Sequence, residues 1–291
     1  MSESSVTIHP WQALRRLTHA RIGLGRTGVS QPSAAQLAFG LAHAQARDAV
    51  HAELAQDSIL AQCAELRPQA VCLHSAAGSR HQYLQRPDLG RRLAATSLHS
   101  LQALATAPCD LAIVIGDGLS ARAVEKHAAP LLRALLARLA ADTECADWRL
   151  APLCLVSGAR VAIGDEIGAV LQARCVVVLI GERPGLSSPE SMGLYLSWAP
   201  RPGLSDAERN CISNIHTAGL SYQAAALKAH YLLAEAQRRG YSGVALKEAG
   251  AATASLDTAR PFLLAEQLNG SSQATMEKTR VRATGLPPAR Q

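Results

Sequence analysis

The sequence RCVVVLIGERPG, from Arg174 to Gly185, indicates the fold more clearly than any other stretch of this chain. Its apolar part, Cys175–Ile180, is rich in β-branched residues and too short for a surface helix. Such a run is typical of a strand that is buried on both faces, as in a parallel sheet covered by helices. The sequence therefore predicts that Cys175–Ile180 is the central strand of an α/β sheet.

A charged turn follows this strand, with Glu182 and Arg183 between Gly181 and Pro184. Ligands of open α/β sheets bind just outside the carboxyl ends of strands, so both charged side chains are candidate ligand contacts. Charged turns after strands are also common on protein surfaces, where these two residues would form an ion pair. The stretch alone leaves both interpretations open.

Strands and helices alternate on both sides of this element. The pattern predicts strands at 111–115, 149–156 and 193–198, and helices at 121–140 (with a break near Pro130), 163–173 and 223–239. This alternation implies a Rossmann-like, mostly parallel sheet over residues 107–247. Residues 1–106 are expected to be helical, with helices at 11–22, at 33–53 and up to about residue 105. Residues 248–291 are rich in Ala, Ser, Thr, Gln and Arg, and we expect a loosely ordered tail that is dispensable beyond about Ala251.

The composition excludes several classes of protein. The net charge of +6 comes from scattered basic residues, which lack the clustering and aromatic platforms of a nucleic-acid interface. The seven cysteines are odd in number and contain no CxxC pair, so the sequence predicts reduced thiols and no metal site. No apolar run reaches membrane-spanning length, and the start of the chain lacks the features of a signal peptide.

A second turn, Gly116–Ala121, formally fits the pattern G-x-G-x-x-A between a strand and a helix. This is the setting of a dinucleotide-binding turn, and it makes a nucleotide-dependent oxidoreductase one alternative. However, Asp117 places a carboxylate where a pyrophosphate would need bare amides and positive potential. We therefore interpret this segment as a Rossmann-like turn without a nicotinamide.

Cys211 and His216 lie close together in the sequence. Such a pair suggests either half of a metal site or a nucleophile with its base. Neither a second pair of ligands nor an oxyanion loop accompanies it, so as chemistry in its own right the signal is weak.

Five segments together resemble the small subunits of ethanolamine ammonia-lyase. They are THARIGLGR (18–26), YLQRPDLGRR (83–92), DGLS (117–120), GERPG (181–185) and CISNIH (211–216). They follow the order of that family and cover about residues 10–247. The resemblance implies a Rossmann-like subunit of an adenosylcobalamin-dependent enzyme that converts ethanolamine to acetaldehyde and ammonia. It also implies a partner, the barrel-shaped large subunit, which carries the substrate and the radical chemistry.

In that family the cobalamin lies between the two subunits. Carried over motif by motif, its contacts match Val161, which follows Gly158-Ala159-Arg160, as well as Glu182 and Cys211. The resemblance implies no catalytic residue and no metal ligand in this chain, because the cofactor carries the difficult chemistry. Residues 1–106 would then contain the interface with the large subunit. We expect a cytoplasmic location, with a bacterial microcompartment as the alternative, and a non-catalytic assembly protein is the other functional alternative.

Overall fold

The computed structural model of the chain describes residues 6–67 and 69–246. These residues belong to one compact unit. The tail predicted at 248–291 lies outside the described residues, so its looseness and dispensability stay predictions.

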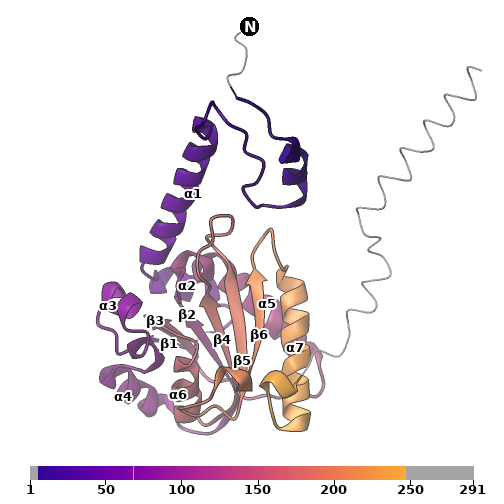
Figure 1. Cartoon of the computed structure of the whole chain (residues 1–291). Helices are drawn as coiled ribbons and strands as arrows, with labels where there is room; N and C mark the ends of the chain where they lie inside the picture. The colour runs from indigo at the N-terminus through magenta and orange to yellow at the C-terminus, as the bar shows by residue number, and fades with distance from the viewer. Residues whose placement is uncertain (1–5, 68, 247–291) are drawn as a thin grey trace, which may run out of the picture. The chain divides into compact units, whose positions relative to one another are not determined.

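A six-stranded sheet forms the centre of this unit (Figure 1). Its strands are β1 (Ala70–His74), β2 (Cys109–Gly116), β3 (Leu153–Ser157), β4 (Ala173–Gly181), β5 (Met192–Trp198) and β6 (Arg209–Ile215). They lie in the order β1-β3-β2-β4-β5-β6, and the first four are mutually parallel. Strands β5 and β6 are antiparallel to their neighbours. The prediction of a mostly parallel α/β sheet is confirmed, and β4 is an inner strand with strands on both sides.

Helices cover both faces of the sheet. On one face lie α2 (Gln56–Cys63), α5 (Ala121–Ala141) and α7 (Tyr222–Arg239), and on the other lie α4 (Ala95–Leu104) and α6 (Ile163–Val170). Val177 and Leu179 of β4 pack into the core with α5 and α7, whereas Val176 and Val178 pack into the core with α6. The strand is therefore buried on both faces, as its uniformly apolar sequence predicts.

Local sequence signals fix the ends of the two longest helices that cover the sheet. Ser120 caps α5 by accepting a hydrogen bond from Ala123 N, and Ser221 caps α7 in the same way through Ala224 N. Gly240 ends α7 in the left-handed conformation, with φ of 74°, which a glycine adopts at little cost. The predicted break near Pro130 is wrong, because α5 continues through this proline without interruption.

Two strands were not predicted. Strand β1 has only five residues and lies within the region 1–106 that the sequence predicts to be helical. Strand β6 carries Arg209, Asn210, Ser213 and Asn214, and polar residues of this kind are poor strand formers. Both strands lie at the edges of the sheet, where the partner strand rather than local propensity determines the conformation.

The remaining elements precede the sheet, connect its strands or follow α7. They are the 3-10 helices η1 (Pro10–Leu17), η2 (Leu89–Arg91), η3 (Asp206–Glu208) and η4 (Gly243–Ala245), and the α-helices α1 (Ser33–His51) and α3 (Arg80–Gln85). The helix predicted at 11–22 is a 3-10 helix that ends at Leu17. Among the described residues, none of the helices combines the length and apolarity needed to cross a membrane.

Candidate functional site

A pocket of about 200 Å³ lies beyond the carboxyl ends of β2, β3 and β4. Helix α3, three loops and the strands β4 and β5 line it, through Tyr83, Gly118, Leu119, Arg160, Val161, Ile180, Gly181, Glu182, Arg183 and Tyr195. Two of the three predicted site residues, Val161 and Glu182, are therefore brought together. Cys211 does not line the pocket, but it lies directly opposite Tyr195 in the β5–β6 pairing.

The Glu182 carboxylate is fixed by hydrogen bonds from the neighbouring chain. Ser191 Oγ donates to Glu182 Oε2 at 2.5 Å, and Asn214 N donates to Oε1 at 3.3 Å. Glu182 is half-buried, whereas Arg183 is exposed, and in the described part of the chain no ion pair joins them. The interpretation of this turn as a surface ion pair is therefore not supported.

Tyr195 connects Glu182 to Cys211. The Tyr195 hydroxyl and the Cys211 thiol interact, and each shifts the pKa of the other. Burial, followed by the neighbouring Cys211 and Glu182, raises the pKa of Tyr195 above its ordinary value. The phenol consequently stays protonated at neutral pH.

Cys211 and His216 do not form the nucleophile and base that their spacing suggested. His216 Nε2 lies 2.9 Å from Asn214 Oδ1, and His216 Nδ1 accepts a hydrogen bond from Ala218 N at 3.3 Å. The histidine therefore stabilises the turn that follows β6. A base for Cys211 would need to lie within hydrogen-bond reach of the thiol.

Asp117 holds three loops of the site together. One oxygen, Oδ1, accepts a hydrogen bond from Ala159 N at 2.8 Å. The other, Oδ2, accepts from Gly158 N at 3.0 Å and from Arg80 Nη1 at 2.9 Å. Asp117 is only 3% exposed, and this burial raises its pKa against the opposing effects of Arg80 and the two amides. A buried carboxylate within the turn opposes the negative charge of a pyrophosphate, which disfavours the dinucleotide interpretation of this turn.

Tyr83 lines the pocket, and two arginine side chains lie against its ring. The guanidinium carbons of Arg160 and Arg80 lie 4.3 Å and 4.8 Å from the centre of its ring, and its hydroxyl donates to Ala159 O at 2.9 Å. Burial, and secondarily the charge of Asp117, raise the pKa of Tyr83. Arg160 Nε is buried and has no hydrogen-bond partner within the described residues. The tyrosine therefore holds Arg160, a donor with spare capacity, at the edge of the pocket.

Two glycines allow the loops of the pocket to meet. A Cβ atom on Gly181 would overlap with the carbonyl oxygen of Ser120, and one on Gly118 would overlap with the carbonyl oxygen of Gly181. Gly118 also has a φ of 56°. Only glycine permits such close contact between backbones, so the turn that follows β4 is pressed against the turn that follows β2.

Four residues of the site were not predicted from the sequence, namely Arg80, Tyr83, Arg160 and Tyr195. Tyr83 belongs to a segment that carries the family resemblance, and Arg160 immediately precedes Val161. Arg80 and Tyr195 have no local signal, because a salt bridge to Asp117 and a cross-strand pair with Cys211 give them their roles.

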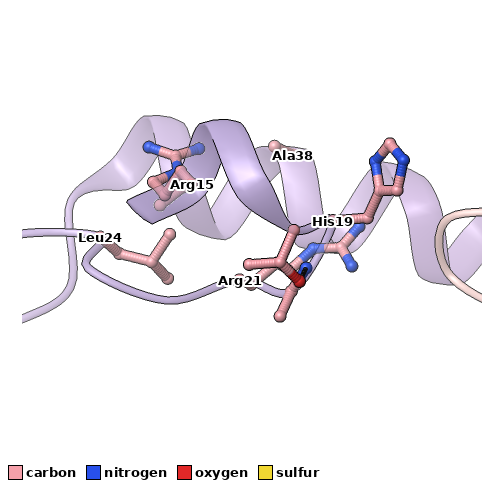
Figure 2. A pocket seen from close by; sticks show the side chains of 8 residues that line it. Arg15, His19, Arg21, Leu24 and Ala38 are labelled. Atoms are coloured by element: carbon pink, nitrogen blue, oxygen red, sulfur yellow. Dashed lines mark hydrogen bonds between the residues drawn. The ribbon is translucent and has the colours of Figure 1, made fainter. Parts of the chain in front are cut away.

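A second and larger pocket, of about 450 Å³, lies in the N-terminal segment. Figure 2 shows the side chains of Arg15, His19 and Arg21 around it, beside α1. The neighbouring surface exposes large apolar side chains, namely Ile8, Trp11, Leu14, Leu17, Val29, Leu37, Phe39 and Leu41. Arg21 Nη2 donates to Leu186 O at 3.3 Å, which links this segment to the loop after Gly185. Basic and apolar groups on one surface are typical of a binding surface for a partner protein.

A family model of the ethanolamine ammonia-lyase light chain matches residues 8–247 of this sequence. The chain belongs to this family. The match includes all the residues that line the two pockets, so the site described above lies within the part that the family shares.

Individual members of the family are similar over most of their length. The chain is 56% identical to the ethanolamine ammonia-lyase small subunit of Ralstonia nicotianae over 249 residues, which cover 84% of this chain and 91% of the relative. It is 56% identical to that of Azotobacter vinelandii, over 84% and 90% of the two chains. For the relative from Xanthomonas campestris pv. campestris the identity is 54%, over 88% and 96%. These names describe one subunit of an ammonia-lyase and so imply a larger partner.

Proposed function

We propose that this chain is the small subunit of an adenosylcobalamin-dependent ethanolamine ammonia-lyase, which converts ethanolamine to acetaldehyde and ammonia. In this proposal the chain holds the cofactor against a catalytic large subunit. The observation that carries the proposal is the convergence of Val161, Glu182 and the Tyr195–Cys211 pair at one edge of the sheet.

The chemistry of these residues fits a cobalamin. The rim of its corrin ring bears amide side chains, which both donate and accept hydrogen bonds. Glu182 offers carboxylate oxygens, Arg160 has an unused buried donor, and Tyr195 keeps its hydroxyl proton. The pocket of about 200 Å³ is too small for the whole cofactor but admits one of its side chains. These residues therefore provide one wall of a cofactor site, called the cofactor wall below, which a second subunit would complete.

The residues of the cofactor wall are suited to binding rather than to proton transfer. Hydrogen bonds from Ser191 and Asn214 fix the Glu182 carboxylate in place. The raised pKa of Tyr195 keeps its phenol protonated near neutral pH, so it is not suited to act as a general base. When bound, adenosylcobalamin supplies the radical by homolysis of its cobalt–carbon bond. Val161 would give shape to the site, and Glu182, Arg160 and Tyr195 would orient the cofactor.

The N-terminal surface supports the partner in this proposal. The segment between residues 8 and 41 combines exposed apolar side chains with a basic pocket, and a large subunit would bury both. We accordingly place the interface with the large subunit within residues 1–106. A cytoplasmic location, or packaging into a bacterial microcompartment, remains a prediction from the family resemblance.

The chain alone is expected to release no ammonia from ethanolamine. Activity should appear only when it is co-expressed with the large subunit and supplied with adenosylcobalamin, because the described pocket contains no acid–base constellation. The measurement is an ammonia assay on the isolated chain and on the complex, each with and without cofactor. Ammonia release by the isolated chain, or by the complex without cobalamin, would contradict the proposal.

Replacement of Glu182 by Gln is expected to weaken cofactor retention by about 0.5–3 kcal/mol, the range for neutral and charge-assisted hydrogen bonds. This corresponds to a roughly 2- to 150-fold higher cofactor requirement. The variant keeps the volume of the side chain but loses the charge. Titration of adenosylcobalamin into the wild-type and variant complexes measures the effect.

Glu190 provides the matched control for this titration. It lies in the loop after the same turn, where it forms a half-exposed ion pair with Lys126 at 2.6 Å. The change Glu190→Gln is expected to leave the titration curve unchanged. If Glu182→Gln also overlaps with the wild type, the carboxylate does not contact the cofactor.

A further inference from the structure

A cluster of three potential metal ligands lies outside the cofactor wall, between α5 and α7. Asp142 follows the last residue of α5, Cys145 lies in the turn after it, and His230 lies in the middle of α7. One ligand atom from each residue lies within 4.8 Å of the other two. Neither the family resemblance nor the proposed function assigns a role to this cluster.

The turn after α5 holds the first two side chains in place. Asp142 O accepts hydrogen bonds from Cys145 N at 3.0 Å and from Ala146 N at 2.7 Å, and Asp142 Oδ1 accepts from Glu144 N at 2.9 Å. This local network places the carboxylate and the thiol on the same side of the turn. The third group comes from α7, because His230 Nε2 lies 2.7 Å from Asp142 Oδ2.

The burial of the three groups differs in a way that suits a metal ion. Cys145 is only 2% exposed, whereas the side chains of His230 and Asp142 are 21% and 23% exposed. The sulfur therefore lies at the base of the cluster and the other two groups reach the solvent. An ion bound here would have a protected thiolate ligand and an open side through which it enters.

The ligand set selects among metals. Magnesium and calcium prefer oxygen ligands alone, whereas sulfur, nitrogen and oxygen together suit Zn²⁺. Zinc bonds of about 2.3 Å to sulfur and 2.0–2.2 Å to nitrogen and oxygen place tetrahedral ligands roughly 3.3–3.7 Å apart. The cluster, with separations up to 4.8 Å, needs side-chain movements of only about 1 Å to reach this geometry.

We propose that Asp142, Cys145 and His230 bind one Zn²⁺ ion that joins the turn after α5 to α7. Cys145 binds as the thiolate and releases its proton to the solvent, and water completes the tetrahedron. The site would link two helices that cover the same face of the sheet. Sequence spacing did not indicate it, because His230 lies far from Cys145 along the chain.

The test is a metal titration of the full chain after treatment with a chelator. Co²⁺ replaces Zn²⁺ as the probe, since a tetrahedral thiolate site gives visible bands and a near-ultraviolet charge-transfer band. We expect saturation at one equivalent, displacement of Co²⁺ by Zn²⁺, and a higher melting temperature with Zn²⁺. Residues 248–291 contain neither Cys nor His, so the tail adds no competing sulfur or imidazole ligand.

Matched variants locate the site. Cys145→Ser and His230→Gln are expected to weaken metal binding at least 10- to 100-fold, since the loss of an outer-shell partner already costs that much. The controls are Cys63→Ser, another buried thiol, and His43→Gln, an exposed histidine outside the cluster. Both controls should bind Co²⁺ as the wild type does.

The absence of saturable binding to the wild type would overturn the proposal. So would binding by Cys145→Ser that equals binding by Cys63→Ser. Circular dichroism establishes that each variant is folded. Asp142→Asn serves as the third ligand variant, because its partly exposed side chain is the least critical for packing, and unchanged binding by this variant and His230→Gln would also overturn the site.

Discussion

Replacement of Asp117 by Asn is expected to lower the free energy of unfolding by about 3–5 kcal/mol, the range for a buried ion pair that loses one partner. The Arg80 guanidinium, whose side chain is 9% exposed, would remain in the protein without its counter-charge. An uncompensated charge in such a setting costs far more than the lost contact itself.

The amide group that this change introduces also places its NH₂ against a hydrogen-bond donor in either orientation. Asp117 Oδ1 accepts from Ala159 N, and Oδ2 accepts from both Gly158 N and Arg80. Whichever oxygen becomes NH₂, two donors therefore face each other. Because Gly158 and Ala159 lead directly to Val161, the variant should also disturb the cofactor wall.

Urea unfolding of the wild type and Asp117→Asn measures the difference, provided that the slope against denaturant is unchanged. Asp88→Asn is the matched control, because Asp88 pairs with Arg86 at 2.7 Å but both side chains are more than half exposed. Because water screens an exposed pair, its loss should change the stability little. Equal destabilisation by the two variants would show that the burial of Asp117 has no energetic consequence.

Replacement of Arg209 by Met is expected to have a comparable effect, again about 3–5 kcal/mol. Arg209 begins β6 and forms a two-pronged ion pair with Asp165 of α6, and the two side chains are 3% and 2% exposed. Its guanidinium also donates to Ser197 Oγ at 3.2 Å and to Leu204 O at 2.8 Å. The variant leaves the Asp165 carboxylate buried without a positive partner.

A double variant separates the stability that the ion pair contributes from the destabilisation caused by a buried charge without a partner. Arg209→Met combined with Asp165→Leu should recover much of the lost stability, because two apolar residues often replace a buried ion pair at little cost. Arg201→Met is the control, since Arg201 forms an exposed pair with Glu208 at 2.9 Å. If the double variant is no more stable than Arg209→Met alone, the loss of stability arises from altered packing and not from the unpaired charge of Asp165.

The candidate site was predicted in part. Val161 and Glu182 follow strands directly, so their place at the carboxyl edge of the sheet is a consequence of parallel topology. Cys211 lies on β6, a strand that was not predicted, and it reaches the site only through its pairing with Tyr195. The roles of Arg80 and Tyr83 depend on contacts with Asp117 and Arg160 that come from distant parts of the chain.

The sequence by itself determined the elements whose signals are local. The apolar run in β4, the serine caps of α5 and α7 and the glycine after α7 each act within a few residues, so they can be recognised before any partner is known. Only the tertiary structure decided the antiparallel edge of the sheet, the partners of Asp117 and the meeting of Cys145 with His230. These features depend on which strands and helices become neighbours, and that choice is made by long-range packing of the whole core.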